Sequence, residues 1–296
     1  VRCVWGRNHD QGGFVETAMA AISVVVVISF ALMAIAVMAQ GPWDTADATF
    51  YGDMSGNATM GEFSCLSSPF FYCSFVVVRE RERERADGVC FGAGGTCGYD
   101  NLFEHGYGLA NGALSTVLFN DGEMCGACFE LKCVAGPDRC KEGSSTILTA
   151  TSFCPPAPVS LCNPPQKHFD LSMRMYMNIA KANNSGSIPV QFRRVPCVRE
   201  GGIGFEFRGN PFWISVLVYN VAGSGDVQKL SVRGSNTTWV PMTRSWGQRW
   251  QLSFKPEMVG QSLSFQVTTG DGKMVESVDV APADWQFGQR YTGGQF

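Results

Sequence analysis

Hydrophobic and polar positions alternate in short runs along the chain after residue 198. Turns rich in Gly, Asn, Asp and Pro separate β-branched and aromatic runs, a pattern that predicts strands joined by tight connections. The predicted strands are 204–207, 212–221, 227–233, 250–254, 262–268 and 274–280. In the run at 212–219 the even positions are apolar and share one face, so Trp213 falls on the other. We expect a sandwich of two sheets with Trp213 exposed.

The first part of the chain is less regular. The run Ala48–Gly52 alternates, contains β-branched and aromatic residues, and ends at Gly, which predicts a strand. Two segments, 111–120 and 170–182, favour short helices, and the second has apolar residues at helical spacing. Asp170 stands at the start of that second helix, where its side chain is suited to be the N-cap.

The N-terminal region contains an apolar run from 20 to 39, followed by Gln40-Gly41-Pro42. Small or short residues precede Gln40, as at a signal-peptidase site, so we expect residues 1–39 to be leader plus signal peptide. A membrane-spanning helix is the alternative, because about 20 apolar residues can cross a bilayer. The cysteine-rich sequence downstream favours cleavage and secretion.

The amino-acid pattern of residues 62–94 differs from that of the flanking sequence. They contain three cysteines and a strict Arg/Glu alternation at 79–85. In a helix this alternation would place like charges four residues apart, and in a strand it would bury nothing. We interpret the segment as a non-native insertion, such as unspliced intron sequence. A charged recognition loop is one alternative, and a chain that does not fold as written is another.

The composition suits β-rich, turn-rich domains. Of 296 residues, 45% are hydrophobic, 17% are charged and 34 are Gly, and the net charge of −3 gives no electrostatic case for nucleic-acid binding. Eight of the 12 cysteines fall between Cys97 and Cys197, which indicates disulfides in an oxidising compartment. The alternative is a zinc site at the C-x-x-C pair Cys125 and Cys128, but no second such pair exists.

With 62–94 set aside, a series of motifs follows in order. They are Ala48–Gly52, Gly95–Tyr99, Gly106–Gly108, Ala113–Thr116, Cys125–Glu130, Phe153–Pro156, His168–Leu171, Arg193–Cys197, Trp246–Trp250 and Phe287–Phe296. In these motifs the chain from Ala48 onward resembles the plant expansins, in particular the α-expansin branch. No single motif decides the matter, but so many in register make the resemblance specific.

The resemblance implies an all-β fold: a double-psi β-barrel at 40–197, followed by an immunoglobulin-like β-sandwich at 198–296 that binds cellulose. It implies a secreted monomer of the cell wall, without metal or organic cofactor. Its partners would be cellulose and xyloglucan-type matrix polysaccharides, whose non-covalent contacts it would disrupt at acid pH without hydrolysis. It also suggests the disulfides Cys97–Cys125, Cys128–Cys197 and Cys133–Cys140, which leaves Cys154 to pair with Cys162.

The barrel also resembles that of the family 45 endoglucanases, which carry the same His-Phe-Asp motif. This likeness places Asp170 at the position of the general acid. We expect a glycan groove whose floor hydrogen-bonds sugar hydroxyls, formed by Thr49, Tyr51, Asp53, His168 and Asp170. Inverting hydrolysis needs a second carboxylate. Asp53 has the spacing of that base, but it is more simply a turn residue.

Two properties of this site stay open at this stage. Burial would raise the pKa of Asp170, whereas an N-cap position would lower it. His168 either takes part in the polar groove or has a structural role. His105 is expected at the surface. The alternative functions are an endoglucanase with Asp170 as acid and Asp53 as base, and a wall-binding protein without loosening activity.

Aromatic side chains of the second domain are the expected cellulose-binding residues. Flat aromatic rings can stack on the apolar faces of glucose. By resemblance, the stacking residues are Trp213, Tyr219 and Trp239. A packing role beside a turn is the alternative for Trp239, and Trp246 and Trp250 fit the core as well as the surface.

Overall fold

The computed structural model describes residues 41–52, 63–64, 74–75, 95–181, 186–253 and 258–296. The predicted leader at 1–39, Asp53 and most of the segment 62–94 lie outside these residues. Within that segment, β2 (Phe63–Ser64) and β3 (Ser74–Phe75) pair antiparallel. In the described part of the chain, no helix is long and apolar enough to cross a membrane.

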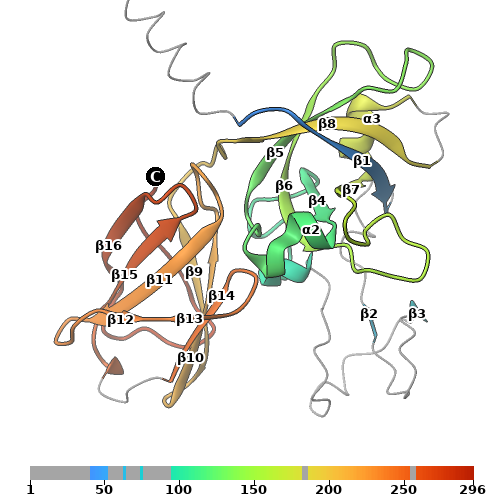
Figure 1. Cartoon of the computed structure of the whole chain (residues 1–296). Helices are drawn as coiled ribbons and strands as arrows, with labels where there is room; N and C mark the ends of the chain where they lie inside the picture. The colour runs from blue at the N-terminus through green and yellow to red at the C-terminus, as the bar shows by residue number, and fades with distance from the viewer. Residues whose placement is uncertain (1–40, 53–62, 65–73, 76–94, 182–185, 254–257) are drawn as a thin grey trace, which may run out of the picture. The chain divides into compact units, whose positions relative to one another are not determined.

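The first set of strands closes into a barrel in the order β1-β7-β4-β6-β5-β8 (Figure 1, blue to yellow). The strands are β1 (Asp44–Tyr51), β4 (Asn111–Leu114), β5 (Cys128–Cys133), β6 (Thr146–Phe153), β7 (His168–Ser172) and β8 (Ile188–Val195). The pairs β1–β7 and β4–β6 are parallel, and the other neighbours are antiparallel. Closure leaves no unpaired sheet edge in the barrel.

Side chains alternate across the barrel wall. On β5, Phe129 and Leu131 are buried in the barrel core, whereas Glu130 and Lys132 are only partly buried. The short helical segments are η2 (Gly95–Tyr99), α2 (Thr116–Phe119), η3 (Asn120–Gly122) and α3 (Met173–Ile179).

Both helix predictions in the barrel need correction. Of the predicted helix 111–120, Thr116–Phe119 is helical (α2), whereas Asn111–Leu114 is a strand, because pairing with β6 and β7 in the barrel outweighs local preference. The second helix begins only at Met173, and its N-cap is Ser172, whose hydroxyl accepts a hydrogen bond from Met175 N at 3.4 Å. Asp170 lies on β7 and is therefore not a helix cap.

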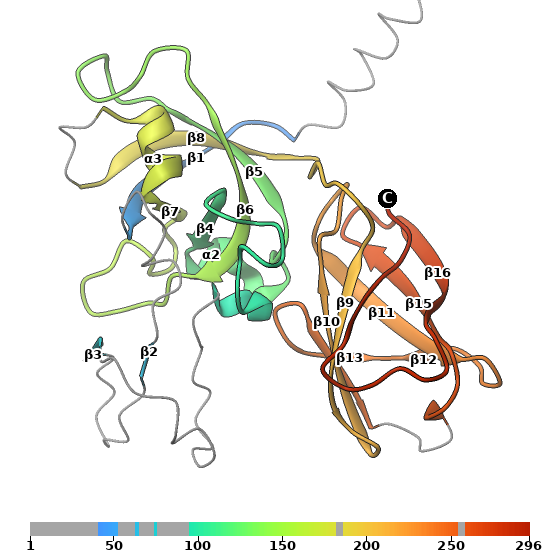
Figure 2. The same ribbon diagram turned by 180° about the vertical axis from the view of Figure 1, so that it is seen from behind.

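The second set of strands forms two sheets that enclose a separate core (Figure 2, orange to red). One sheet has the order β13-β14-β10-β9-β17 and the other β12-β11-β15-β16. The strands are β9 (Gly204–Asn210), β10 (Trp213–Tyr219), β11 (Val227–Gly234), β12 (Val240–Pro241), β13 (Thr243–Trp246), β14 (Arg249–Ser253), β15 (Leu263–Thr269), β16 (Met274–Ala281) and β17 (Arg290–Thr292). The architecture is the predicted all-β pair of barrel and sandwich.

Strand β10 is buried on both faces along most of its length. Ile214, Val216 and Val218 pack in the sandwich core, as the alternation predicts, while Leu217 on the other face packs in the barrel core. Barrel and sandwich belong to one compact unit, Pro42–Phe296. Phe212, predicted on the core face, precedes the strand and is 73% exposed.

Candidate functional site

The parallel pairing of β1 and β7 brings three of the predicted groove residues together. Thr49 stands opposite Asp170 in the register of these strands. His168 and Asp170 are two residues apart on β7 and therefore project to the same face, while Phe169 between them is fully buried in the core. Ser115 fixes the start of β7, because its hydroxyl accepts a hydrogen bond from His168 N at 3.1 Å.

The hydroxyl of Thr49 connects the acid and the imidazole. It donates to Asp170 Oδ1 at 2.8 Å and lies 2.8 Å from His168 Nε2. A hydroxyl has one proton, so while it donates to Asp170 it must accept from His168 Nε2–H. This arrangement requires the Nε2–H tautomer. The other ring nitrogen, Nδ1, is buried and has no hydrogen-bond partner among the described residues.

Burial shifts both titrating groups toward their neutral forms. Burial raises the pKa of Asp170 above its ordinary value, and the hydrogen bond from Thr49 opposes this only in part. Burial lowers the pKa of His168, against the opposing charge of Asp47. The open question about Asp170 is thus settled in favour of burial, since Asp170 caps no helix.

The side chain of Tyr51 is hydrogen-bonded to Asn111, the first residue of strand β4. Its hydroxyl donates to Asn111 Oδ1, and the amide of Asn111 donates in turn to Gly108 O. Burial, with the charge of Asp170, raises the pKa of Tyr51, so the phenol stays neutral. The sequence analysis did not single out Asn111, because its segment was interpreted as helical. The signal that could have identified Asn111 is that a polar residue begins a buried run there. Asp53 lies outside the described residues.

The predicted stacking aromatics differ in exposure and position. Trp213 opens β10 and is 41% exposed. Trp239 is half-buried next to β12, in the other sheet, and the guanidinium of Arg233 lies 4.5 Å from its ring centroid. Tyr219 is also half-buried, and its ring lies so close to Gly204 that a Cβ there would clash with it. Trp213 therefore offers the most accessible ring of the three.

The sequence left open whether Trp246 and Trp250 lie in the core or at the surface, and the structure places them in different environments. Trp250 is 3% exposed and belongs to the sandwich core. Trp246 is half-buried, and its indole N–H donates to Thr96 O of the barrel region.

The prediction that His105 lies at the surface is wrong. His105 is 2% exposed, and its ring meets that of Tyr219 edge-on at a centroid distance of 4.3 Å. Its Nδ1 lies 2.9 Å from Asn101 O, and its Nε2 lies 3.3 Å from Glu206 Oε2 on β9. The hydrogen bond with His105 is the largest cause that lowers the pKa of the buried Glu206. His105 thus joins a barrel loop to the sandwich.

The described residues contain four disulfides. They are Cys97–Cys125, Cys128–Cys197, Cys133–Cys140 and Cys154–Cys162. These are the pairs that the resemblance suggests, including the last one, inferred from the cysteines that remain. Sulfur taken up in disulfides cannot ligate zinc, so the zinc alternative at Cys125 and Cys128 is wrong.

Two family models match the chain. The expansin C-terminal domain matches residues 203–282, within the sandwich, and a double-psi barrel model described as lytic transglycolase matches residues 111–192. Each match falls on one of the two β-structures described above.

Curated plant proteins are similar over most of the chain. Expansin-A22 of Arabidopsis thaliana is 44% identical over 255 residues, covering 85% of this chain and 78% of the relative. Expansin-A7 of the same plant is 42% identical over 85% of this chain and 84% of the relative. Expansin-A32 of Oryza sativa subsp. japonica is 42% identical over 85% and 83%.

Solved structures share the architecture at low sequence identity. The apo expansin of Clavibacter michiganensis superposes with a TM-score of 0.56 at 14% identity, over 86% of this chain and 97% of that chain. A point mutant of that protein in complex with cellohexaose gives a TM-score of 0.55, also at 14% identity, over 85% and 96%. The architecture of a barrel followed by a sandwich, together with the similarity to the curated relatives, defines the class of protein. The chain belongs to the expansins, cell-wall-loosening proteins, and to their α-expansin branch.

Proposed function

We propose that this protein loosens the extracellular plant cell wall by binding cellulose-type and xyloglucan-type polysaccharides as a monomer, without hydrolysing them. The barrel holds a glycan through Thr49, Tyr51, His168 and Asp170. The sandwich holds the cellulose surface through Trp213, with Trp239 as a secondary contact. The cellohexaose complex of the bacterial expansin supports a cellulose-type ligand for the shared fold.

One observation carries the non-hydrolytic part of this proposal. The pKa of Asp170 is raised by burial, and no other carboxylate among the described residues contributes to the shift. A second carboxylate at the retaining distance of about 5 Å would repel the Asp170 charge and raise the pKa further. Among the described residues, Asp170 therefore has no second carboxylate close enough to act as the nucleophile of a retaining hydrolase. Asp53, the candidate base of an inverting hydrolase, lies outside the described residues, so the Asp53→Asn arm of the assay below tests that alternative.

The same carboxyl accounts for action at acid pH. Because burial raises the pKa of Asp170, acidification converts it to a carboxylic acid more readily than an exposed Asp. The protonated group can donate a hydrogen bond to a glycan oxygen, which the carboxylate cannot. Competition for the hydrogen bonds between glycan chains would then be strongest in an acidified wall.

A creep assay on heat-killed wall strips, run together with a reducing-end assay, tests this function. We expect extension under load at acid pH with no rise in reducing ends, and reduced extension for Asp170→Ala, which removes the side-chain donor and acceptor. Wall binding without extension would identify a passive binding protein. Reducing ends that rise with time and disappear in Asp53→Asn would identify an endoglucanase.

A further inference from the structure

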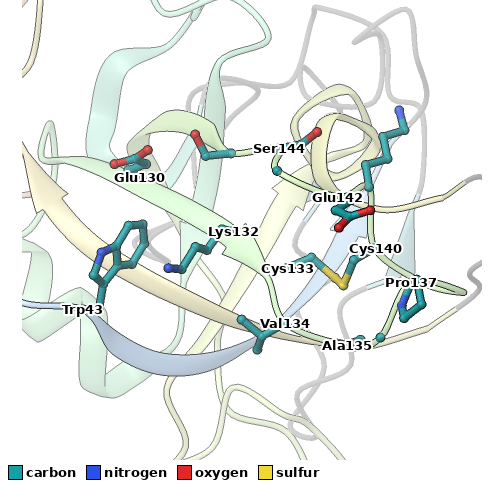
Figure 3. A pocket seen from close by; sticks show the side chains of 14 residues that line it. Trp43, Glu130, Lys132, Cys133, Val134, Ala135, Pro137, Cys140, Glu142 and Ser144 are labelled. Atoms are coloured by element: carbon teal, nitrogen blue, oxygen red, sulfur yellow. A yellow bond between two sulfur atoms is a disulfide. The ribbon is translucent and has the colours of Figure 1, made fainter.

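A cleft of about 560 Å³ lies on the outside of the barrel, beside the start of β1. Trp43, Glu130 and Lys132 form one wall, and residues of the loop 133–145 form the other. Figure 3 shows Trp43 and Lys132 next to one another, with the Cys133–Cys140 disulfide farther along the cleft. Thr49 is six residues farther along the chain than Trp43, roughly 20 Å at about 3.3 Å per strand residue. The cleft is thus separate from the groove residues.

The alternation of β5 explains why polar groups line this cleft. Phe129 and Leu131 point into the barrel core, so Glu130 and Lys132 point outward. Arg193 stands directly opposite Glu130 on β8 and also points outward. Trp43 immediately precedes β1, the other neighbour of β8, and so lies over this outer surface.

The charges in the cleft are unequally paired. Glu130 Oε2 accepts from Arg193 Nε at 2.8 Å and lies 2.6 Å from its Nη2, so its charge is neutralised. Lys132 forms no ion pair with any described carboxylate, and its Nζ lies 4.2 Å from the Trp43 ring centroid. On the opposite wall, Lys141 and Glu142 carry opposite charges. Lys132 and Lys141 both lack an ion pair with a described carboxylate, but Lys141 Nζ donates to Met177 O at 2.5 Å, whereas Lys132 lies beside Trp43 in the cleft.

The loop 133–145, which forms the opposite wall of the cleft, is held in place by a disulfide and hydrogen bonds. The disulfide between Cys133 and Cys140 closes a short loop, and Cys140 N donates to Gly136 O at 3.0 Å inside it. Arg139 donates to Ser187 O, which ties the loop to the start of β8. A wall held in place loses little conformational freedom when a ligand binds, which favours affinity.

We propose that this cleft binds a uronate residue of an acidic polysaccharide through its carboxylate, which pairs with Lys132. Trp43 positions this cation, because Lys132 and Arg193 both lie over its ring, 4.2 Å and 4.5 Å from the centroid. A cation over an aromatic face is attracted by the negative face of the ring, which helps to hold the Lys132 ammonium in place. A charge-assisted hydrogen bond from an ammonium to a carboxylate is stronger than a neutral one. The cleft and the groove would allow one molecule to contact an acidic and a neutral wall polymer. Binding at the cleft does not depend on the proposed loosening function.

The first test compares two ligands on the unaltered protein. Isothermal titration calorimetry at low salt would use a galacturonate hexamer and its fully methyl-esterified form, which has the same sugar rings without charge. We expect the acid to bind roughly tenfold more tightly or better, with the difference shrinking as NaCl screens the ion pair. Equal affinities, or no binding of the acid, would overturn the proposal.

The second test places the ligand at the cleft. We expect Lys132→Gln and Trp43→Ala each to weaken hexamer binding about tenfold, while Lys229→Gln, which removes an exposed lysine of the sandwich, has no effect. Unchanged binding by both cleft variants would place the acid elsewhere and refute the site. If Trp43→Ala fails to fold, Lys132→Gln and the comparison with the ester remain decisive, because neither disturbs a packed side chain.

Discussion

Thr49 on β1 donates its only hydroxyl proton to Asp170 Oδ1 on β7, at 2.8 Å and in direct register across a parallel strand pair. The same oxygen lies 2.8 Å from His168 Nε2. One hydroxyl therefore fixes both the acid that we propose to contact glycan and the tautomer of the histidine beside it.

Replacing Thr49 with Val removes this hydroxyl at nearly constant volume. His168 and Asp170 then lose a largely buried hydrogen-bond partner on the groove face of β7, and we expect the free energy of unfolding to fall by about 1–3 kcal/mol. The hydrogen bond from Thr49 lowers the pKa of Asp170, so its loss should raise that pKa further. Denaturant unfolding and carboxyl-carbon NMR titration would measure the two effects.

Thr49→Ser is the matched control, because it keeps the hydroxyl. We expect its Asp170 titration to follow that of the unaltered protein. A Thr49→Val protein that titrates in the same way as Thr49→Ser would show that the hydrogen bond has no influence on the acid.

Asp170→Asn should change stability in a pH-dependent way. The pKa of Asp170 is raised in the folded protein. Its contribution to stability is therefore present below the ordinary value of 3.8 and is lost as the pH rises through the folded pKa. Asn does not ionise, so we expect the variant to gain thermal stability relative to the unaltered protein between about pH 3 and about pH 7. A constant difference in melting temperature would contradict the shifted titration.

Glu206→Gln should destabilise the contact between β9 and the barrel loop. Glu206 is buried, and its carboxylate contacts His105, Arg208 and Arg290. Removing one partner of a buried charged cluster costs about 3–5 kcal/mol. Because the folded pKa of Glu206 is lowered, its contribution is present above the ordinary value of 4.5 and is lost as the pH falls below it. Thermal melts across this range would measure the difference.

The matched control for Glu206→Gln is Glu276→Gln, which removes the charge of a carboxylate at the protein surface. Glu276 pairs with Arg233 at 3.3 Å on the exposed side of the sandwich, where ion pairs contribute about 0–1 kcal/mol. Equal losses from the two variants would mean that burial of Glu206 has no energetic consequence.

Trp213→Ala should weaken cellulose binding more than Trp239→Ala. Trp213 is 41% exposed at the start of β10, whereas Arg233 already lies over the ring of Trp239. An aromatic contact contributes about 1 kcal/mol, or roughly fivefold in affinity. Depletion binding to microcrystalline cellulose would compare them. A larger loss for Trp239→Ala would assign the main stacking role to the other sheet.

The sequence predicted the sandwich more accurately than the barrel. The alternation between residues 204 and 280 marks the strands of the sandwich, and six of the observed strands begin or end near the predicted bounds. Strand β10 also packs its second face against the barrel core through Leu217, which the alternation did not show. Short strands such as β12 and β17 were missed, because two or three residues carry no periodicity. The prediction of one helix over 111–120 is correct only for Thr116–Phe119. All four residues of Asn111–Leu114 are buried in the barrel, so this strand lacks the alternation of polar and apolar residues that would identify it in the sequence.

Site prediction succeeded where the family resemblance supplied the long-range contact and failed where no resemblance pointed to one. The resemblance to the endoglucanase barrel implied that Thr49, His168 and Asp170 share one groove, and the strand register brings them together. Nothing near His105 indicates burial, because its partner Glu206 is 101 residues away, on the sandwich.

The most direct test of the central claim, that Asp170 acts on glycan without hydrolysis, is creep of heat-killed wall strips in water enriched in oxygen-18. Hydrolysis of a glycosidic bond incorporates one oxygen atom from water into a new chain end. We predict that the strips extend at acid pH while oxygen-18 in polysaccharide ends stays at the level of a heat-inactivated sample. Label that accumulates with time, and that stops in Asp170→Asn, would contradict the account.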